Sequence, residues 1–163
     1  MKPLTNERWG FRSNCFVCEP TNGAGLRIPF FHDETTDSVV ADLQLDDRFS
    51  GAPTYVHGGV LLAVLDEAMA WAGIAIGASW AVTGETTTRF ERPVVVGEPH
   101  RVTARIDGEK RGTKLFAEAE ITDAEGARCA TATATLIVLG DAQLAEAAGV
   151  GVDELDEGLR RHA

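Results

Sequence analysis

The sequence is poor in cysteine and in basic residues, and each shortage excludes a class of protein. It has three cysteines in 163 residues, Cys15, Cys18 and Cys129, which are too few to hold together a disulfide-stabilised secreted domain. Fifteen Lys and Arg residues stand against 25 Asp and Glu residues, so the formal net charge is −10. Such an acidic chain lacks the basic surface that nonspecific binding to nucleic acid or to anionic membranes requires.

Repeats, low-complexity tracts and linker-like stretches are also lacking, and the length suits one domain. Hydrophobic residues make up 44% and charged residues 25% of the chain, which is ordinary for a globular protein. The N-terminal sequence MKPLTNERWGFRSN has no apolar core of the kind found in secretion signals. We therefore expect a cytoplasmic protein with reduced cysteines.

One apolar segment, from Gly58 to Ala78, is long enough to raise the question of a membrane span. Its only charged residues, Asp66 and Glu67, lie at its centre, where each would cost roughly 3 kcal/mol in lipid. No second apolar span is available to shield them. The segment therefore predicts a helix over 58–76 that is buried in protein on most sides and stops at Gly77.

Apolar residues alternate with polar ones in the segments around this helix, which is the pattern of half-buried strands. The expected strands are Leu26–Phe31, Ser38–Leu43, 84–92, Arg101–Asp107, Leu115–Thr122 and 127–139, with a loop at 46–56. Connections of hairpin length make the last three strands antiparallel neighbours. A curved antiparallel sheet wrapped around one apolar helix satisfies both patterns, so we expect an α+β fold.

Small residues follow one face of the expected helix and surround one acid. The face comprises Gly59, Ala63, Asp66, Ala70, Gly73 and Gly77, at spacings of three and four. Room around Asp66 makes a functional carboxylate and a structural one equally good interpretations. Glu67 is rotated by about 100°, and we expect it to reach a sheet partner or the surface.

The helix begins with His57-Gly58-Gly59, where free backbone N–H groups and the helix dipole create a site for a developing oxyanion. Taken alone, these residues are more typical of a glycine-rich turn with a capping or packing histidine. Gly58 and Asp66 are eight residues apart, about 12 Å along a helix. If both act on one carbonyl group, one must come from a second copy, which predicts a symmetric dimer.

Three segments carry a resemblance to a known family. HGGVLLAVLDEAMAWA (57–72), CFVCEPTNGAGLRIPFF (15–31) and TTTRFERPVVVGEPHRVTARI (86–106) resemble the HGG-type, PaaI-like hotdog-fold acyl-CoA thioesterases, over roughly residues 15–139. The resemblance implies a single hotdog domain, which we expect over 1–163 with an N-terminal extension (1–25). Residues 141–163 form an acidic C-terminal tail with a net charge of −4, and we expect a surface helix or a frayed tail there. The resemblance also implies a long central helix wrapped by a curved antiparallel sheet of about six strands.

By this resemblance, the Gly58 amide polarises the thioester carbonyl and Asp66 of the partner chain acts as base or nucleophile. Thr83 helps to place the water, and His57 belongs to the same catalytic segment. The residues expected to bind the substrate are Gly59, Arg92, Arg89, Gly51 and Thr54. The family often has Asn or Gln where this chain has Gly51, and Thr54 or Ser50 are candidates to replace it.

The expected activity is hydrolysis of an acyl-CoA without a metal or a cofactor other than the CoA of the substrate. The expected assembly is a homodimer that pairs further to a homotetramer. Residues 89–114 carry a net charge of +3, a local strip that can attract CoA phosphates, with Arg92 the first candidate. The large side chains proposed to line an acyl pocket are Trp71, Met69, Trp80 and Phe90.

Two other functions remain open on the same fold. A non-catalytic acyl-CoA or fatty-acyl binding protein is kept open by Gly51, and a hydratase or dehydratase is the weaker option because its histidine motif is lacking. Cys15 and Cys18 form a CxxC pair without further Cys or His residues at ligand spacing. That pair alone is weak for zinc, so we expect a packing role.

Overall fold

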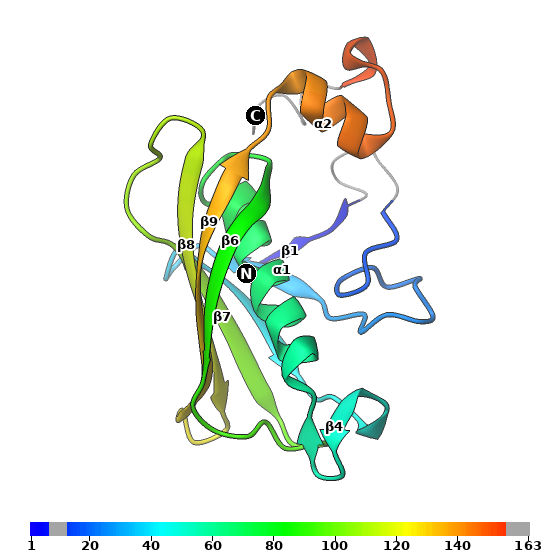
Figure 1. Ribbon diagram of the computed structural model, residues 1–163, viewed down its shortest axis with the longest axis vertical. Coiled ribbons are helices and arrows are strands. Elements are labelled where there is room, and N and C mark those ends of the chain that lie inside the picture. The colour runs from blue at the N-terminus through cyan, green and yellow to red at the C-terminus, as the bar shows by residue number, and fades with distance from the viewer. Residues whose placement is uncertain (7–12, 156–163) are drawn as a thin grey trace.

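Helix α1 (Gly58–Ala75) lies along one face of a large antiparallel sheet, as Figure 1 shows. The computed structural model describes residues 1–6 and 13–155, and in this part of the chain the sheet has seven strands in the order β1-β2-β3-β7-β8-β9-β6. Those strands are β1 (Lys2–Leu4), β2 (Phe30–Asp33), β3 (Ser38–Leu43), β6 (Ala81–Phe90), β7 (His100–Ile106), β8 (Lys114–Asp123) and β9 (Arg128–Val138). The α+β class predicted from the sequence is confirmed.

Burial of α1 explains why its sequence is so apolar. Val64, Leu65, Ala68 and Met69 are completely buried against the sheet, and each large side chain contributes roughly 1.5–3 kcal/mol by leaving water. Within the described residues, α1 is the one helix long and apolar enough to span a bilayer, and half of it is buried inside the fold. Its apolar composition is therefore accounted for by the protein core.

The sheet supplies the other half of the core through alternating side chains. On the central strands, Val39, Val102, Ile121 and Leu136 are completely buried. On β7, β8 and β9 the neighbours of these residues along the strand are more exposed, whereas most of β3 is buried. The hairpins β7–β8 and β8–β9 are antiparallel, as their short connections predicted. Period-two alternation thus identified the strands that carry the core.

Three expectations about the flanking segments were wrong. The strand expected at Leu26–Phe31 begins only at Phe30, because the backbone of residues 26–28 bonds to the turn at 16–18 instead. The short edge strand β1, which lacks any alternating pattern, was missed. The expected loop at 46–56 contains a 3-10 turn, η2 (Asp47–Phe49), and a small hairpin, β4 (Ser50–Ala52) with β5 (Tyr55–Val56).

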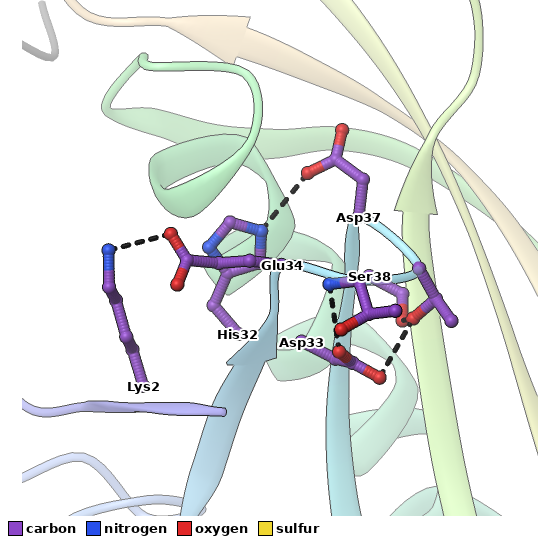
Figure 2. A network of polar contacts seen from close by, with 8 residues as sticks. Lys2, His32, Asp33, Glu34, Asp37 and Ser38 are labelled. Carbon is purple, nitrogen blue, oxygen red and sulfur yellow. Dashed lines mark hydrogen bonds and ion pairs between the residues drawn. The ribbon is translucent and has the colours of Figure 1, made fainter.

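Surface polar contacts hold the ends of β1, β2 and β3 in register (Figure 2). Lys2 on β1 is 2.6 Å from Glu34, and His32 on β2 is 3.0 Å from Asp37. Asp33 accepts hydrogen bonds at 3.0 Å from Thr35 N–H and from the hydroxyl of Thr36. Because these groups are largely exposed, the network shapes the β2–β3 turn more than it stabilises the fold.

The acidic C-terminal region forms helix α2 (Asp141–Ala148) and a 3-10 turn, η3 (Val152–Glu154). A surface helix or frayed tail was expected over 141–163. The helix is present, but Leu144, Ala145 and Leu155 are buried, so the segment packs onto the fold. Residues 156–163 lie outside the described part of the chain.

Gly77 has a different role from the expected helix stop. Its N–H bonds to the carbonyl of Ala72 at 3.0 Å, and the left-handed residue after the helix is Ala78, with φ of 45°. A Cβ at position 77 would lie 2.6 Å from Leu115 Cδ2 and 2.8 Å from the carbonyl oxygen of Gly73. Gly77 therefore permits the end of α1 to approach β8 closely.

This close approach predicts that Gly77→Ala lowers the free energy of unfolding by about 1–3 kcal/mol, since the added methyl group overpacks the junction. Urea unfolding measures the change. Gly23→Ala is the matched control, because a Cβ at position 23 meets no atom within 4 Å. Equal stability of the two variants would contradict the assignment.

Candidate functional site

The N-terminus of α1 leaves one backbone donor for a ligand. His57 caps the helix: its Nδ1 accepts a hydrogen bond from Gly59 N–H at 2.9 Å, and its carbonyl accepts from Val60 and Leu61 at 2.9 and 3.2 Å. Within residues 1–6 and 13–155, the remaining first-turn donor, Gly58 N–H, has no partner. The helix dipole places partial positive charge there, so Gly58 N–H is suited to an anionic or carbonyl oxygen.

A surface pocket of about 320 Å³ opens beside this donor. The residues that line it come from β5, α1, β6 and the segment after β6: Tyr55, Val56, Gly58, Leu61, Phe90, Glu91, Arg92, Pro93 and Val94. Phe90 is 53% exposed, and its ring lies 3.5 Å from where a Cβ of Gly58 would be. The pocket thus combines an aromatic wall, one guanidinium group and a free N–H.

The carboxylate of Asp66 has its own partner on the edge strand. Thr83 Oγ1 on β6 donates to Asp66 Oδ1 at 2.6 Å, a length typical of a hydroxyl bonded to a carboxylate. Thr83 lies where the register of β6 against β9 shifts, next to Gly84. The two side chains are partly buried. The structure thus brings together Asp66 and Thr83, two of the expected catalytic residues, which are 17 positions apart in the sequence.

Within one chain, the Asp66–Thr83 pair lies apart from the pocket at Gly58. Eight residues of helix separate Gly58 from Asp66, about 12 Å, and neither Asp66 nor Thr83 lines the pocket. No single carbonyl group can contact both within one chain.

The small-residue face of α1 is divided in two. Its N-terminal half, with Gly59, Ala63 and Ala70, stays at least partly exposed around Asp66. Its C-terminal half faces the sheet, since a Cβ at Gly73 would lie 3.2 Å from Leu136. This face is therefore open to a partner only as far as Ala70, because the sheet packs against the end of the helix.

Gly51 and its proposed substitutes lie on the β4–β5 segment, outside the pocket. A Cβ at Gly51 would be 3.0 Å from His57 Cα and Cδ2, so the His57 ring occupies the space next to this glycine. Ser50 Oγ donates to the carbonyl of Asp47 at 2.8 Å. The carbonyl of Thr54 accepts from Val96 N–H at 3.0 Å, and its side chain does not line the pocket.

The expected basic strip does not converge on one site. Arg92 lines the pocket and Arg89 does not. Arg101 pairs with Asp42 at 2.8 Å, and Arg111 stacks over Phe116 with 5.5 Å from its Cζ to the ring centroid. Strand direction and pleat disperse these charges over the surface, which a count along the sequence cannot reveal.

Three of the four expected pocket residues belong to the core instead. Met69, Trp71 and Trp80 are 0%, 2% and 8% exposed, whereas Phe90 lines the pocket. Tyr55, which also lines it, was missed by the sequence analysis, although its place two residues before the helix cap was a usable signal.

Glu67 points to the two cysteines of the N-terminal segment, which was not expected. Its Oε2 lies 3.4 Å from Cys15 Sγ, and the ligand atoms of Cys15, Cys18 and Glu67 lie within 4.8 Å of one another. Burial, with the neighbouring Cys15, raises the pKa of the Glu67 carboxyl to about 7. The expectation of a sheet partner or free surface is therefore corrected: Glu67 joins α1 to the N-terminal segment.

Comparisons with known proteins identify the fold. Residues 54–130 match the family described as the thioesterase superfamily. A solved structure described as a thioesterase superfamily protein has a TM-score of 0.72 and 25% identity, covering 80% of this chain and 64% of that one. A phenylacetic acid degradation-related protein of Ralstonia eutropha JMP134 has a TM-score of 0.60 and 27% identity, covering 68% and 84%. The chain has the hotdog fold.

A Streptococcus mutans UA159 protein solved with acetyl CoA has a TM-score of 0.59 and 20% identity, covering 63% of this chain and 82% of that one. No curated protein matches the chain. The predicted hotdog fold is confirmed, with seven strands in the described sheet where about six were expected. The family match contains Gly58, Asp66, Thr83 and Arg92, and it leaves out Cys15 and Cys18.

The capping geometry predicts that His57→Ala lowers the free energy of unfolding by about 1 kcal/mol, since the Gly59 N–H loses its acceptor. His57→Asn supplies an acceptor at the same place and should retain most of the stability. Urea unfolding of the two variants measures the difference. A His57→Ala variant as stable as His57→Asn would contradict the capping role.

Proposed function

We propose that this hotdog protein hydrolyses an acyl-CoA thioester to the free acid and CoA, in the manner of the HGG-type thioesterases. The observation that carries the proposal is the free Gly58 N–H beside a pocket, together with a carboxylate one half-helix away that bonds to a threonine hydroxyl. The superfamily match over 54–130 and a structural relative solved with acetyl CoA support the substrate class.

In this proposal the helix N-terminus polarises the carbonyl group. Gly58 N–H donates to the thioester oxygen, and the bond strengthens as negative charge develops on that oxygen in the transition state. His57 holds the first turn in place by engaging the neighbouring N–H groups, which leaves Gly58 free. Arg92 at the pocket rim pairs with a CoA phosphate.

Asp66 and Thr83 then act on water. Asp66 accepts a proton from a water molecule, whose oxygen attacks the carbonyl carbon, and the hydroxyl of Thr83 fixes the carboxylate. The tetrahedral intermediate collapses, the C–S bond breaks, and the CoA thiolate leaves and takes up a proton. Attack by Asp66 itself, through an anhydride that water then hydrolyses, is the alternative route.

The two halves meet only if the protein is a homodimer. Two copies of α1, packed antiparallel along Gly59, Ala63 and Ala70, would bring Gly58 of one chain to the partner's Asp66. Strand β6 supports this arrangement, because it ends the described sheet and its outer edge has no strand partner there. We propose that these dimers pair further into tetramers and that the protein is cytoplasmic.

Asp66→Asn tests the chemistry. It keeps the shape of the side chain and removes the base, so thiol release from short, long and aryl acyl-CoAs should fall by about 10²-fold or more. Glu118→Gln, on the outer face of the sheet, is the matched control and should keep the wild-type rate. Full activity of Asp66→Asn would contradict the proposal.

A mixed dimer tests the shared site. Gly58→Pro removes the N–H at a position where helices accept proline, and His57 already has the extended ψ of 132° that a residue before proline requires. Gly58→Pro and Asp66→Asn chains should each be inactive. Co-expressed, half of the dimers would hold one native site, which gives about a quarter of wild-type activity. No recovery by folded mixed dimers would contradict the shared site.

The second candidate is an acyl-CoA binding protein without turnover. It is favoured by Gly51, which offers no side chain to a substrate or a water molecule and adjoins the His57 ring. Calorimetric binding of an acyl-CoA without thiol release would select it. A hydratase would leave the thioester intact, so product analysis separates that function.

A further inference from the structure

Two segments far apart in the sequence bring three metal-ligating side chains together. Cys15 and Cys18 lie in the N-terminal segment, and Glu67 lies near the middle of α1. Their ligand atoms are all within 4.8 Å of one another, and Cys15 Sγ is 3.4 Å from Glu67 Oε2. In a tetrahedral zinc site, standard Zn–S and Zn–O lengths place sulfur and oxygen ligands about 3.6 Å apart. The observed separation fits such a site.

The backbone of the turn is arranged to favour a thiolate at Cys15. Val17 N–H and Cys18 N–H both donate to Cys15 Sγ, at 3.3 and 3.5 Å. Such convergent N–H groups stabilise negative charge on the atom that they surround. A second polar group, Asn6 Nδ2, lies 3.6 Å from Cys18 Sγ.

The turn is itself held rigidly by the segment that follows it. Leu26 N–H and Ile28 N–H bond to the carbonyl groups of Phe16 and Val17 at 2.8 and 2.9 Å. Gly25 makes this pairing possible, because a Cβ there would lie 2.5 Å from the Phe16 carbonyl oxygen. The two cysteines thus lie in one turn that hydrogen bonds hold in place. Their C-x₂-C spacing is the one found in many structural zinc sites.

Glu67 has no basic partner among residues 1–6 and 13–155, where no ion pair joins it to a Lys, Arg or His residue, and the neighbouring Asp66 adds a further acid. Three groups that can each offer a negatively charged ligand atom thus lie together, and a bound cation would neutralise them.

We propose that Cys15, Cys18 and Glu67 bind one zinc-class divalent cation, with the fourth position filled by water or another small ligand. Two thiolates select a borderline-soft metal such as Zn²⁺ over Mg²⁺ or Ca²⁺. The ion would fasten the N-terminal segment to α1 at the residue next to Asp66. This role is structural, and it holds whether or not the protein is a thioesterase.

The first test is metal content and cobalt spectroscopy of the whole chain. Protein produced without an affinity tag and purified under reducing conditions should hold about one zinc per chain by mass spectrometry. Protein stripped of metal by a chelator should bind Co²⁺ with the intense absorption of a tetrahedral thiolate site. It should also melt at a lower temperature than the zinc-loaded protein.

Variants identify the ligands. Cys15→Ser and Cys18→Ser should each lose about half or more of the thiolate-to-cobalt absorption, because one of two thiolates is removed. Glu67→Gln should weaken Co²⁺ binding at least about tenfold. Cys129→Ala removes the cysteine outside the cluster, and Glu19→Gln removes the exposed carboxylate next to Cys18. Both controls should bind Co²⁺ as the wild type does, and circular dichroism confirms that every variant is folded.

Three results would overturn the proposal. The first is reduced wild-type protein that holds no zinc and gives only the weak spectrum of hydrated Co²⁺. The second is Glu67→Gln with unchanged affinity and spectrum. The third is a Cys15–Cys18 disulfide in freshly isolated protein, detected as a mass lower by two hydrogens, because this would make the pair a redox couple. None of these readouts depends on thioester hydrolysis.

Discussion

Burial of α1 against the sheet is the constraint on which the rest of the structure depends. A helix that is apolar on most of its circumference has to be covered on most sides, and the curved sheet covers it from β3 to β6. This packing fixes where the helix begins, and therefore where the Gly58 N–H points. It also leaves about half of the helix residues at least partly exposed, and Asp66 is among them.

The two adjacent acids show how helical geometry separates functions. Asp66 and Glu67 differ by about 100° around the helix axis. Asp66 therefore faces Thr83 on the edge strand, whereas Glu67 faces the cysteines of the N-terminal segment. One carboxylate lies beside the end strand of the described sheet, and the other connects two segments of one chain.

At the start of α1, His57 accepts the hydrogen bonds of the first turn, and the glycines leave space for its ring. The His57 side chain accepts from Gly59 N–H, and its carbonyl accepts from Val60 and Leu61. Within the described residues, the Gly58 N–H is left without a partner. A glycine at 59 gives the His57 ring room, because a Cβ there would lie 3.1 Å from His57 Nδ1. The same ring fills the space beside Gly51, so the conformation of the helix cap and the packing of the β4–β5 hairpin depend on each other. The free donor is thus a product of the capping arrangement.

The sequence by itself determined the central helix and the alternating strands, because hydrophobic periodicity and helix-start signals are local. The interest in Thr83 came from the family resemblance. The sequence also predicted that Gly58 and Asp66 cannot meet within one chain, since helix rise is constant. Tertiary structure alone decided that Thr83 bonds to Asp66, that Met69, Trp71 and Trp80 fill the core, and that the arginines disperse. It alone brought Glu67 to Cys15 and Cys18, because contacts across about 50 residues depend on how the segments pack.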